Sequence, residues 1–167
     1  MRGVNSGLLA VIMLAVLFAA GCNSKPAGPP IGATVDPKLV ADELGTLAGT
    51  WVYERQVVGG REIPIAELRQ DTIVVTGNSL VRSLAGGDGQ RVKPVRSTIS
   101  VDPTASPKLM DDDADVGFRI SRRLGIYKLE GDTLTICYDN KGAQRPTAFD
   151  SPEGSSIVLT VLRRQRK

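Results

Sequence analysis

Short runs in which apolar and polar residues alternate occupy most of this 167-residue chain, and they limit its possible folds more than any other feature. Each run is bounded by Gly, Asn, Asp or Pro, and an alternation of period two is typical of a β-strand with one buried face. Eight strands are predicted, one beginning at Trp51 and the others at TIVVTG, SLVRSLA, QRVKPVRSTISV, SPKLM, GFRISRRLGIYKLE, DTLTICYD and SIVLTVLRR. The breaks TGNS, AGGDGQ and LEGDT predict tight turns, because Asn, Asp and Gly accept a positive φ. Consecutive strands are therefore expected to run antiparallel.

Short antiparallel strands must protect their edges, and closing into a barrel removes the edges altogether. The sequence therefore predicts an all-β fold, an eight-stranded antiparallel barrel, with a two-sheet β-sandwich as the alternative. Two short helices interrupt the pattern. In DPKLVADELG, Asp36 is placed as an N-cap, Pro37 at the first helical position and Gly45 just past the end. In IPIAELR, Pro64 is placed to begin one helical turn.

The N-terminal residues have the features of an exported protein. Arg2, an apolar run over residues 8–20 and then small residues follow the layout of a secretory signal. The run is shorter than the roughly 20 residues that span a bilayer. The residues AAGC, ending at Cys22, resemble the bacterial lipobox, whose cysteine receives acyl chains such as palmitate and becomes the new N-terminus. The alternative is an ordinary signal peptide that leaves Cys22 to form a disulfide with Cys137.

This interpretation divides the chain into a lipoprotein signal peptide over residues 1–21, a flexible tether over 22–36 and one domain over 37–167. The tether is rich in Pro and Gly and has no apolar period. The formal charge of +3 falls by one when Arg2 is removed, so the charge gives no reason to predict a nucleic-acid partner. A lipid on Cys22 implies the membrane as a partner and a place in the cell envelope, facing the periplasm or the exterior.

Several motifs point to one kind of barrel. LAGTW resembles the start of a lipocalin-type barrel, in which Gly-x-Trp opens the first strand and the indole closes one end. Together with GGREIPIAEL, SVDPTASPKLMD, LGIYKLEGDTLTICYD and RPTAFDSPEGSSIVLTVLRR, it makes residues 44–164 resemble a lipocalin-like domain family of unknown function that is expanded in planctomycete bacteria. The resemblance implies a lipocalin-like barrel and no particular activity. It also implies structural roles for Gly49 and Trp51, with Arg163 lying across the indole, or Arg164 if the register is shifted by one.

Three further groups of residues could bind ions or take part in a reaction. The acidic run DDDAD, residues 111–115, could offer oxygen ligands to Ca²⁺, but it matches no known loop spacing, and we expect a solvated hairpin tip. Cys137 has no identifiable activating neighbour and is expected to be an unreactive structural thiol. The cations Arg119, Arg122 and Arg123 and the tail RRQRK could contact anionic phosphates or lipid headgroups, although solvated faces commonly look the same.

An enzymatic role has little support in the sequence. The chain contains no His, which removes the commonest general base, and the spacing of its carboxylates singles out no catalytic pair. GGDG lies between predicted strands and is expected to be a turn rather than a phosphate loop. We therefore expect no catalysis, no cofactor and no metal.

The remaining hypotheses both concern binding. An eight-stranded barrel is either filled by its own side chains or just wide enough for one small ligand. The first hypothesis is a binding module for a small apolar ligand, with Trp51, Tyr53 and Tyr127 as the candidate lining residues. The alternative is a structural or protein-interaction module of the cell envelope with a filled barrel.

Overall fold

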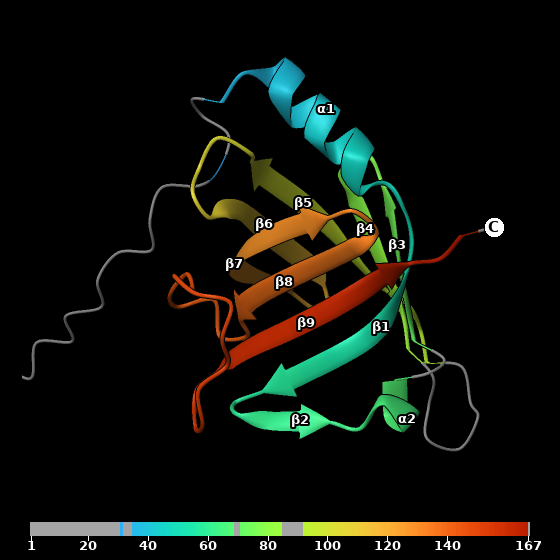
Figure 1. The fold of residues 1–167 in the computed structure, drawn as a ribbon, viewed down its shortest axis with the longest axis vertical. Helices are drawn as coiled ribbons and strands as arrows, with labels where there is room; N and C mark the ends of the chain where they lie inside the picture. The colour runs from blue at the N-terminus through green and yellow to red at the C-terminus, as the bar shows by residue number, and fades with distance from the viewer. Residues whose placement is uncertain (1–30, 32–34, 69–70, 85–91, 167) are drawn as a thin grey trace, which may run out of the picture.

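The computed structural model describes residues 31, 35–68, 71–84 and 92–166, and these form a closed antiparallel β-barrel (Figure 1). Its eight strands, in spatial order, are β1 (Gly49–Val58), β3 (Thr72–Thr76), β4 (Ser79–Ser83), β5 (Val95–Asp102), β6 (Lys108–Asp115), β7 (Ile120–Glu130), β8 (Thr133–Asp139) and β9 (Ile157–Arg164). The ring closes because β1 pairs with β3 along one edge and with β9 along the other.

The structure confirms the predicted strands and the barrel, and the double pairing of β1 excludes the sandwich. A further short strand, β2 (Arg61–Ile63), was not predicted and pairs with the end of β1 outside the ring. The predicted signal peptide with Cys22, most of the tether and the AGGDGQ turn lie outside the described residues.

Helix α1 (Pro37–Leu47) covers one end of the barrel (Figure 1). The side chain of Asp36 accepts a hydrogen bond from the Lys38 amide at 2.8 Å, which confirms the predicted N-cap. The prediction that Gly45 ends the helix is wrong, because the helix continues to Leu47. Leu47 is fully buried in the barrel core, and this packing outweighs the low helix propensity of glycine. The second helix, α2 (Ile65–Leu68), follows Pro64 as predicted.

The barrel core is densest beneath α1. The central cluster joins α1 to residues from all eight strands of the ring: Leu47, Trp51, Ile73, Val75, Leu80, Ile99, Val101, Met110, Tyr127, Leu134, Ile136 and Leu162. Glu43 of α1 links the helix to the strands, because it accepts hydrogen bonds from the Tyr127 hydroxyl at 2.9 Å and from Lys108 Nζ at 2.8 Å. This end of the barrel is therefore closed by packing and by polar contacts together.

A second apolar cluster lies on the outer face of the barrel. Val57, Ile126, Cys137 and Leu159 form it, and Phe149 from the connection between β8 and β9 packs against it. The carboxylate of Asp139 holds this connection in place by accepting hydrogen bonds from the amides of Lys141, Ala143 and Gln144. The outer face of β7, β8 and β9 is therefore covered by the chain itself.

Candidate functional site

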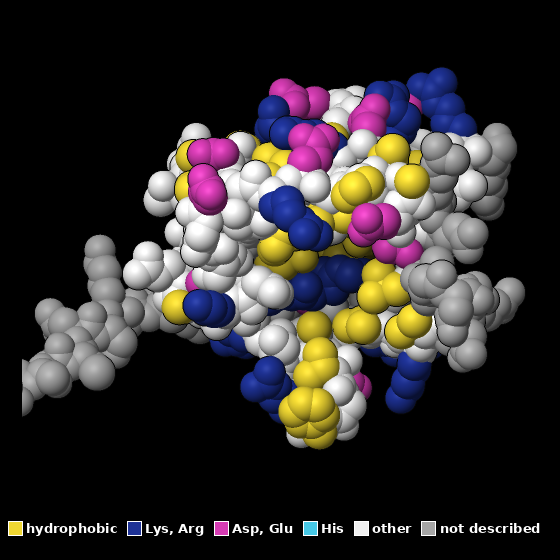
Figure 2. Space-filling model, turned by 90° about the horizontal axis from the view of Figure 1, so that it is seen from below, with side chains coloured by type: hydrophobic (Ala, Val, Ile, Leu, Met, Phe, Trp, Pro, Cys, Tyr) yellow, Lys and Arg dark blue, Asp and Glu magenta, His cyan; other side chains and the backbone are white. Residues whose placement is uncertain are grey.

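The strand alternation divides the barrel interior into an apolar half and a polar half. Residues that face each other across paired strands share a face, so the inward positions follow from the register. Nearest α1 these positions are apolar and belong to the core cluster. Farther from α1 the inward positions carry Arg82, Ser97, Asp112, Arg123 and Tyr138. Viewed from this opposite end, the molecule shows a hollow with Lys or Arg side chains at its floor and hydrophobic side chains around it (Figure 2).

Trp51 closes the apolar half and takes no part in the hollow. Its side chain is fully buried, and its indole Nε1–H donates to the Leu47 carbonyl at 3.0 Å. The guanidinium that stacks on the indole, 4.2 Å from the ring centre, belongs to Arg164. The prediction of Arg163 in this role is wrong, because Arg163 is on the outer side of β9 and pairs with Glu54 at 2.8 Å. The bulge in β1 between Tyr53 and Arg55 shifts the β1–β9 register, and it places Arg164 opposite Trp51.

Both the backbone conformation and the close neighbours of Gly49 favour glycine at this position. Its φ of +139° lies outside the range that most L-residues adopt. A Cβ atom at this position would also lie 2.9 Å from Nη1 of Arg164. The same Arg164 donates from Nη2 to the carbonyl of Thr46 at 2.8 Å, so it satisfies a free carbonyl at the end of α1.

The two predicted tyrosine lining residues lie in different halves. Tyr127 is buried in the apolar core, and burial, with its hydrogen bond to Glu43, raises the pKa of its hydroxyl. Tyr53 is partly buried at the boundary with the polar half. Burial raises the pKa of Tyr53 to about 12, although the nearby charge of Arg82 opposes the rise. Both hydroxyls are therefore protonated at neutral pH.

The polar half is organised around one carboxylate. Both Arg82 and Arg123 direct a guanidinium Nη2 at the same oxygen, Oδ2 of Asp112, at 2.6 Å in the case of Arg123. Arg82 Nη1 also donates to the Ser97 hydroxyl at 3.2 Å, and the Arg123 guanidinium lies 4.8 Å from the centre of the Tyr138 ring. The three charged side chains are only 9–11% exposed. We call Arg82, Asp112 and Arg123 the charged triad.

Burial and charge act in opposite directions on the triad. Burial alone would raise the pKa of Asp112, but the two guanidinium groups outweigh it and hold that pKa below its ordinary value. Burial would likewise lower the pKa of Arg82, and the Asp112 carboxylate outweighs it and raises that pKa. Asp112 and Arg82 therefore remain charged at neutral pH. Two buried polar atoms of the triad, Nε of Arg123 and Oδ1 of Asp112, have no hydrogen-bond partner within the described part of the chain.

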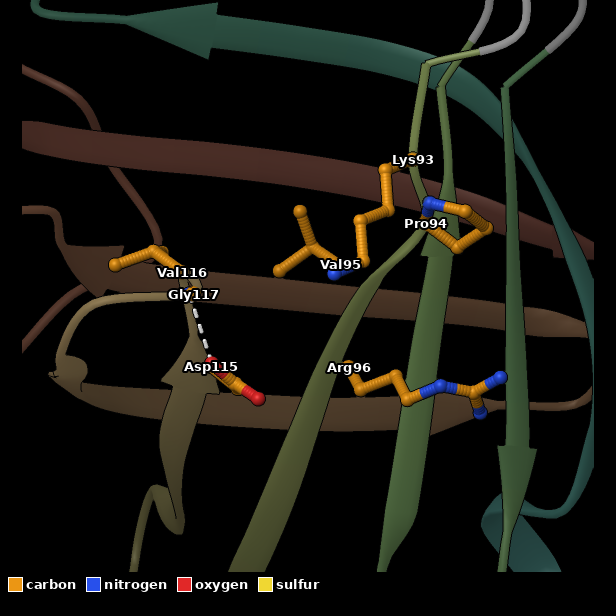
Figure 3. Close-up of a pocket in the computed structure, with 7 residues that line it drawn as sticks. All are labelled: Lys93, Pro94, Val95, Arg96, Asp115, Val116 and Gly117. Carbon is orange, nitrogen blue, oxygen red and sulfur yellow. Dashed lines mark hydrogen bonds between the residues drawn. The ribbon is translucent and has the colours of Figure 1, made fainter.

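A cavity of about 370 Å³ opens beside the triad, where β5 and β6 separate beyond the pair formed by Arg96 and Asp115. Lys93, Pro94 and Val95 border it as the chain enters β5, and Asp115, Val116 and Gly117 border it as the chain leaves β6 (Figure 3). Val95 lies directly opposite Arg82 in the sheet register, so the cavity adjoins the triad. The Arg96 side chain extends away from Val116. The cavity volume falls within the range typical of small-molecule sites.

The acidic run does not form the predicted hairpin tip. Residues 111–115 belong to β6, and their carboxylates point to both faces of the strand, where those of Asp111, Asp112 and Asp113 form ion pairs with arginines. Asp112 faces inward to the triad, whereas Asp111 pairs on the outer face with Arg145 at 2.7 Å and Asp113 with Arg122 at 2.6 Å. These ion pairs compensate the charge and allow a strand with Asp111 and Asp112 buried.

The predicted arginine cluster is likewise split between faces. Arg122 is exposed on the outer side, and Arg123, the next residue along β7, lies inside the barrel. Grouping Arg123 with solvated cations was therefore wrong. The missed signal was present in the strand pattern, because Leu80 and Arg82, and equally Met110 and Asp112, occupy successive positions on one face. A charge in a core-facing position is a signal of a polar interior.

Cys137 lies in the outer apolar cluster and is buried with a free thiol. Its thiol donates to the Asp150 carbonyl at 3.3 Å, and burial raises its pKa to about 11. A protonated, covered thiol is a poor nucleophile at neutral pH. The alternative disulfide to Cys22 involves a residue outside the described part of the chain.

Within the described ranges, no group of three or more His, Cys, Asp or Glu side chains is arranged to hold a metal ion. No helix in the described part of the chain has the length and apolarity needed to cross a membrane.

Comparisons with family models, with curated proteins and with solved structures find no match to this chain. The closed eight-stranded antiparallel barrel is consistent with a lipocalin-like fold. Any function of the polar half of the barrel and of the cavity beside it must therefore be inferred from their geometry.

Proposed function

We propose that this protein is a lipid-anchored binding protein of the cell envelope that holds a small, largely apolar molecule in the open half of its barrel. The cavity of about 370 Å³ between the ends of β5 and β6 is the observation that carries the proposal. Val95, which lines this cavity, faces inward and lies opposite Arg82 in the sheet, so the cavity borders the polar half of the barrel. The closed eight-stranded barrel supports the same role, because a barrel of this strand number can be just wide enough for one small ligand.

The binding role is tested by native mass spectrometry of the mature protein, purified from its own membrane in a mild detergent. We expect a retained small molecule on the wild-type protein. The variant Ala114→Trp should lose it, because Ala114 is a buried small residue on the inward face of β6 between Asp112 and Val116. A wild-type protein that carries no adduct, and that binds no apolar probe in titrations, would refute the proposal.

The alternative role, a structural or protein-interaction module, requires a filled interior. The packed half beneath α1 meets this requirement, but the polar half with its adjoining cavity does not. The geometry therefore favours ligand binding, and we propose a role without catalysis.

The anchor is proposed to be an acylated Cys22, on the strength of the AAGC motif and the apolar run before it. We expect labelled palmitate to enter the wild-type protein and the Cys22→Ala variant to remain unlabelled and to leave the membrane fraction, because two or three acyl chains give stable attachment. Cys137→Ala is the matched control and should remain anchored, since that thiol is buried in the folded domain. A Cys22→Ala protein that stays membrane-bound to the same degree would contradict the assignment.

A further inference from the structure

The charged triad leaves one guanidinium donor, Nε of Arg123, and one carboxylate acceptor, Oδ1 of Asp112, without a partner among the described residues. Both guanidinium groups converge on the single atom Oδ2 of Asp112, and only Arg82 has a second protein acceptor, Ser97, among the contacts of the triad. The Nε–H of Arg123 is buried without an acceptor from any residue that the structure describes. A buried donor left without a partner costs about 1–3 kcal/mol, more when the group is charged. The interior thus contains a donor that is ready for an acceptor from a ligand.

The charges of the triad do not cancel. Two guanidinium groups face one carboxylate, so one positive charge is in excess. Asp71, buried just before β3, is a second carboxylate at this end, and its charge acts on Tyr53. At the rim of the cavity the exposed Lys93 adds a cation, and the Asp115 carboxylate accepts from the Gly117 amide at 2.8 Å. The triad itself carries one net positive charge in a poorly solvated interior, and this charge favours a partner that carries one negative charge.

Several inward-facing residues between the triad and solvent are apolar. Val95 and Val116 line the cavity, and Ala114 precedes Val116 on the same inward face of β6. Val58 and Val158 form an inward-facing pair at the same end of the barrel. An occupant would therefore meet cations at its inner end and apolar side chains along its length. Such a lining matches an amphipathic molecule better than a wholly apolar or a wholly polar one.

We infer that the ligand of the barrel is a small amphipathic monoanion, and that its carboxylate is bound by Arg123 and Arg82 while its apolar part lies against Val95 and Val116. This inference rests on the proposed binding function and specifies its ligand class. A carboxylate suits the site because it is planar and can accept two hydrogen bonds from one guanidinium fork. The excess of one positive charge in the triad matches a monoanion.

The test compares decanoate with decan-1-ol, which has the same chain length and no charge, by isothermal titration calorimetry on residues 23–167, the chain that follows the predicted lipidation site. We expect wild-type protein to bind decanoate at least about tenfold more tightly, as charge-assisted hydrogen bonds contribute more than neutral ones. Arg123→Gln should reduce this preference to within about threefold, chiefly by weakening decanoate binding. A residue with a purely structural role would weaken both probes alike and leave the preference unchanged.

Arg122→Gln is the matched control, because this neighbour in the chain is exposed on the opposite face of β7 and should leave the preference unchanged. Arg123→Lys keeps a positive charge beside Asp112 and serves if the glutamine variant does not fold; it should give an intermediate preference. Equal affinity of wild-type protein for both probes would overturn the anion inference and leave the binding function standing. Binding of neither probe would overturn both.

Discussion

Replacing Trp51 by alanine is expected to reduce the free energy of unfolding by about 3–5 kcal/mol, which is the usual cost of removing a large buried aromatic side chain. The indole is fully buried at the centre of the cluster beneath α1, and its Nε1–H bonds to the last residue of that helix. The variant also removes the surface on which Arg164 stacks, and Arg164 in turn contacts the end of α1 through the Thr46 carbonyl. One substitution therefore weakens the core and the attachment of the helix together.

Urea unfolding followed by far-ultraviolet circular dichroism measures this effect, since the chain contains a single Trp and the variant has no indole fluorescence. Phe118→Ala is the control, because that aromatic side chain is 85% exposed and its loss should change stability by less than about 0.5 kcal/mol. A Trp51→Ala protein within about 1 kcal/mol of wild type would show that the closed end does not depend on the indole as described.

Asp112→Asn is expected to destabilise the fold by about 3 kcal/mol or more, because it leaves two buried guanidinium groups without their shared negative charge. Asp112 and both arginines are at most 11% exposed, so solvent screens these interactions little. The matched control is Asp113→Asn, the next residue in the chain, whose partner Arg122 is exposed on the outer face. That exposed ion pair should contribute less than about 1 kcal/mol to the free energy of unfolding.

The same carboxylate gives the protein a pH dependence of defined sign. The pKa of Asp112 lies below its ordinary value in the folded protein, so its ionisation stabilises the fold. This contribution is complete above the pKa of an unfolded-chain aspartate, about 3.9, and is lost as pH falls through the lower folded value. Urea titrations of wild type and Asp112→Asn at pH 6 and at pH 3 should therefore converge toward the lower pH. A difference that stays constant, with equal destabilisation by the Asp113→Asn control, would mean that the triad charge has no special role.

The strand order of the barrel could be predicted from the sequence because it depends on local patterns. Alternation located every strand of the ring, and turn residues such as those in LEGDT fixed the antiparallel connections. The position of Arg164 over Trp51 was not predictable in the same way. It depends on a bulge in β1, and a shift of one residue moves a side chain to the opposite face of its strand.

The polar interior was the main feature that sequence reasoning missed. Asp112 and Arg123 belong to consecutive charged residues, DDDAD and SRR, and runs of charge are typical of solvated loops. In the barrel the register brings these runs face to face, so that Asp112 lies opposite Arg123 and Asp113 opposite Arg122. The pairing of each charge with an opposite charge is therefore a property of the strand register, which a single strand does not reveal. Arg82, the third member of the triad, comes from β4. It is too far from Asp112 in the sequence for a local pattern to predict their contact.

The most direct test of the central claim is a crystal structure of residues 23–167 grown with decanoate. We expect density for one decanoate in the open half of the barrel, with its carboxylate within hydrogen-bond distance of Arg123 and its chain against Val95 and Val116. Decanoate found only outside the barrel, for instance in the shallow groove between α1 and β5, with an interior closed by side chains, would contradict the account.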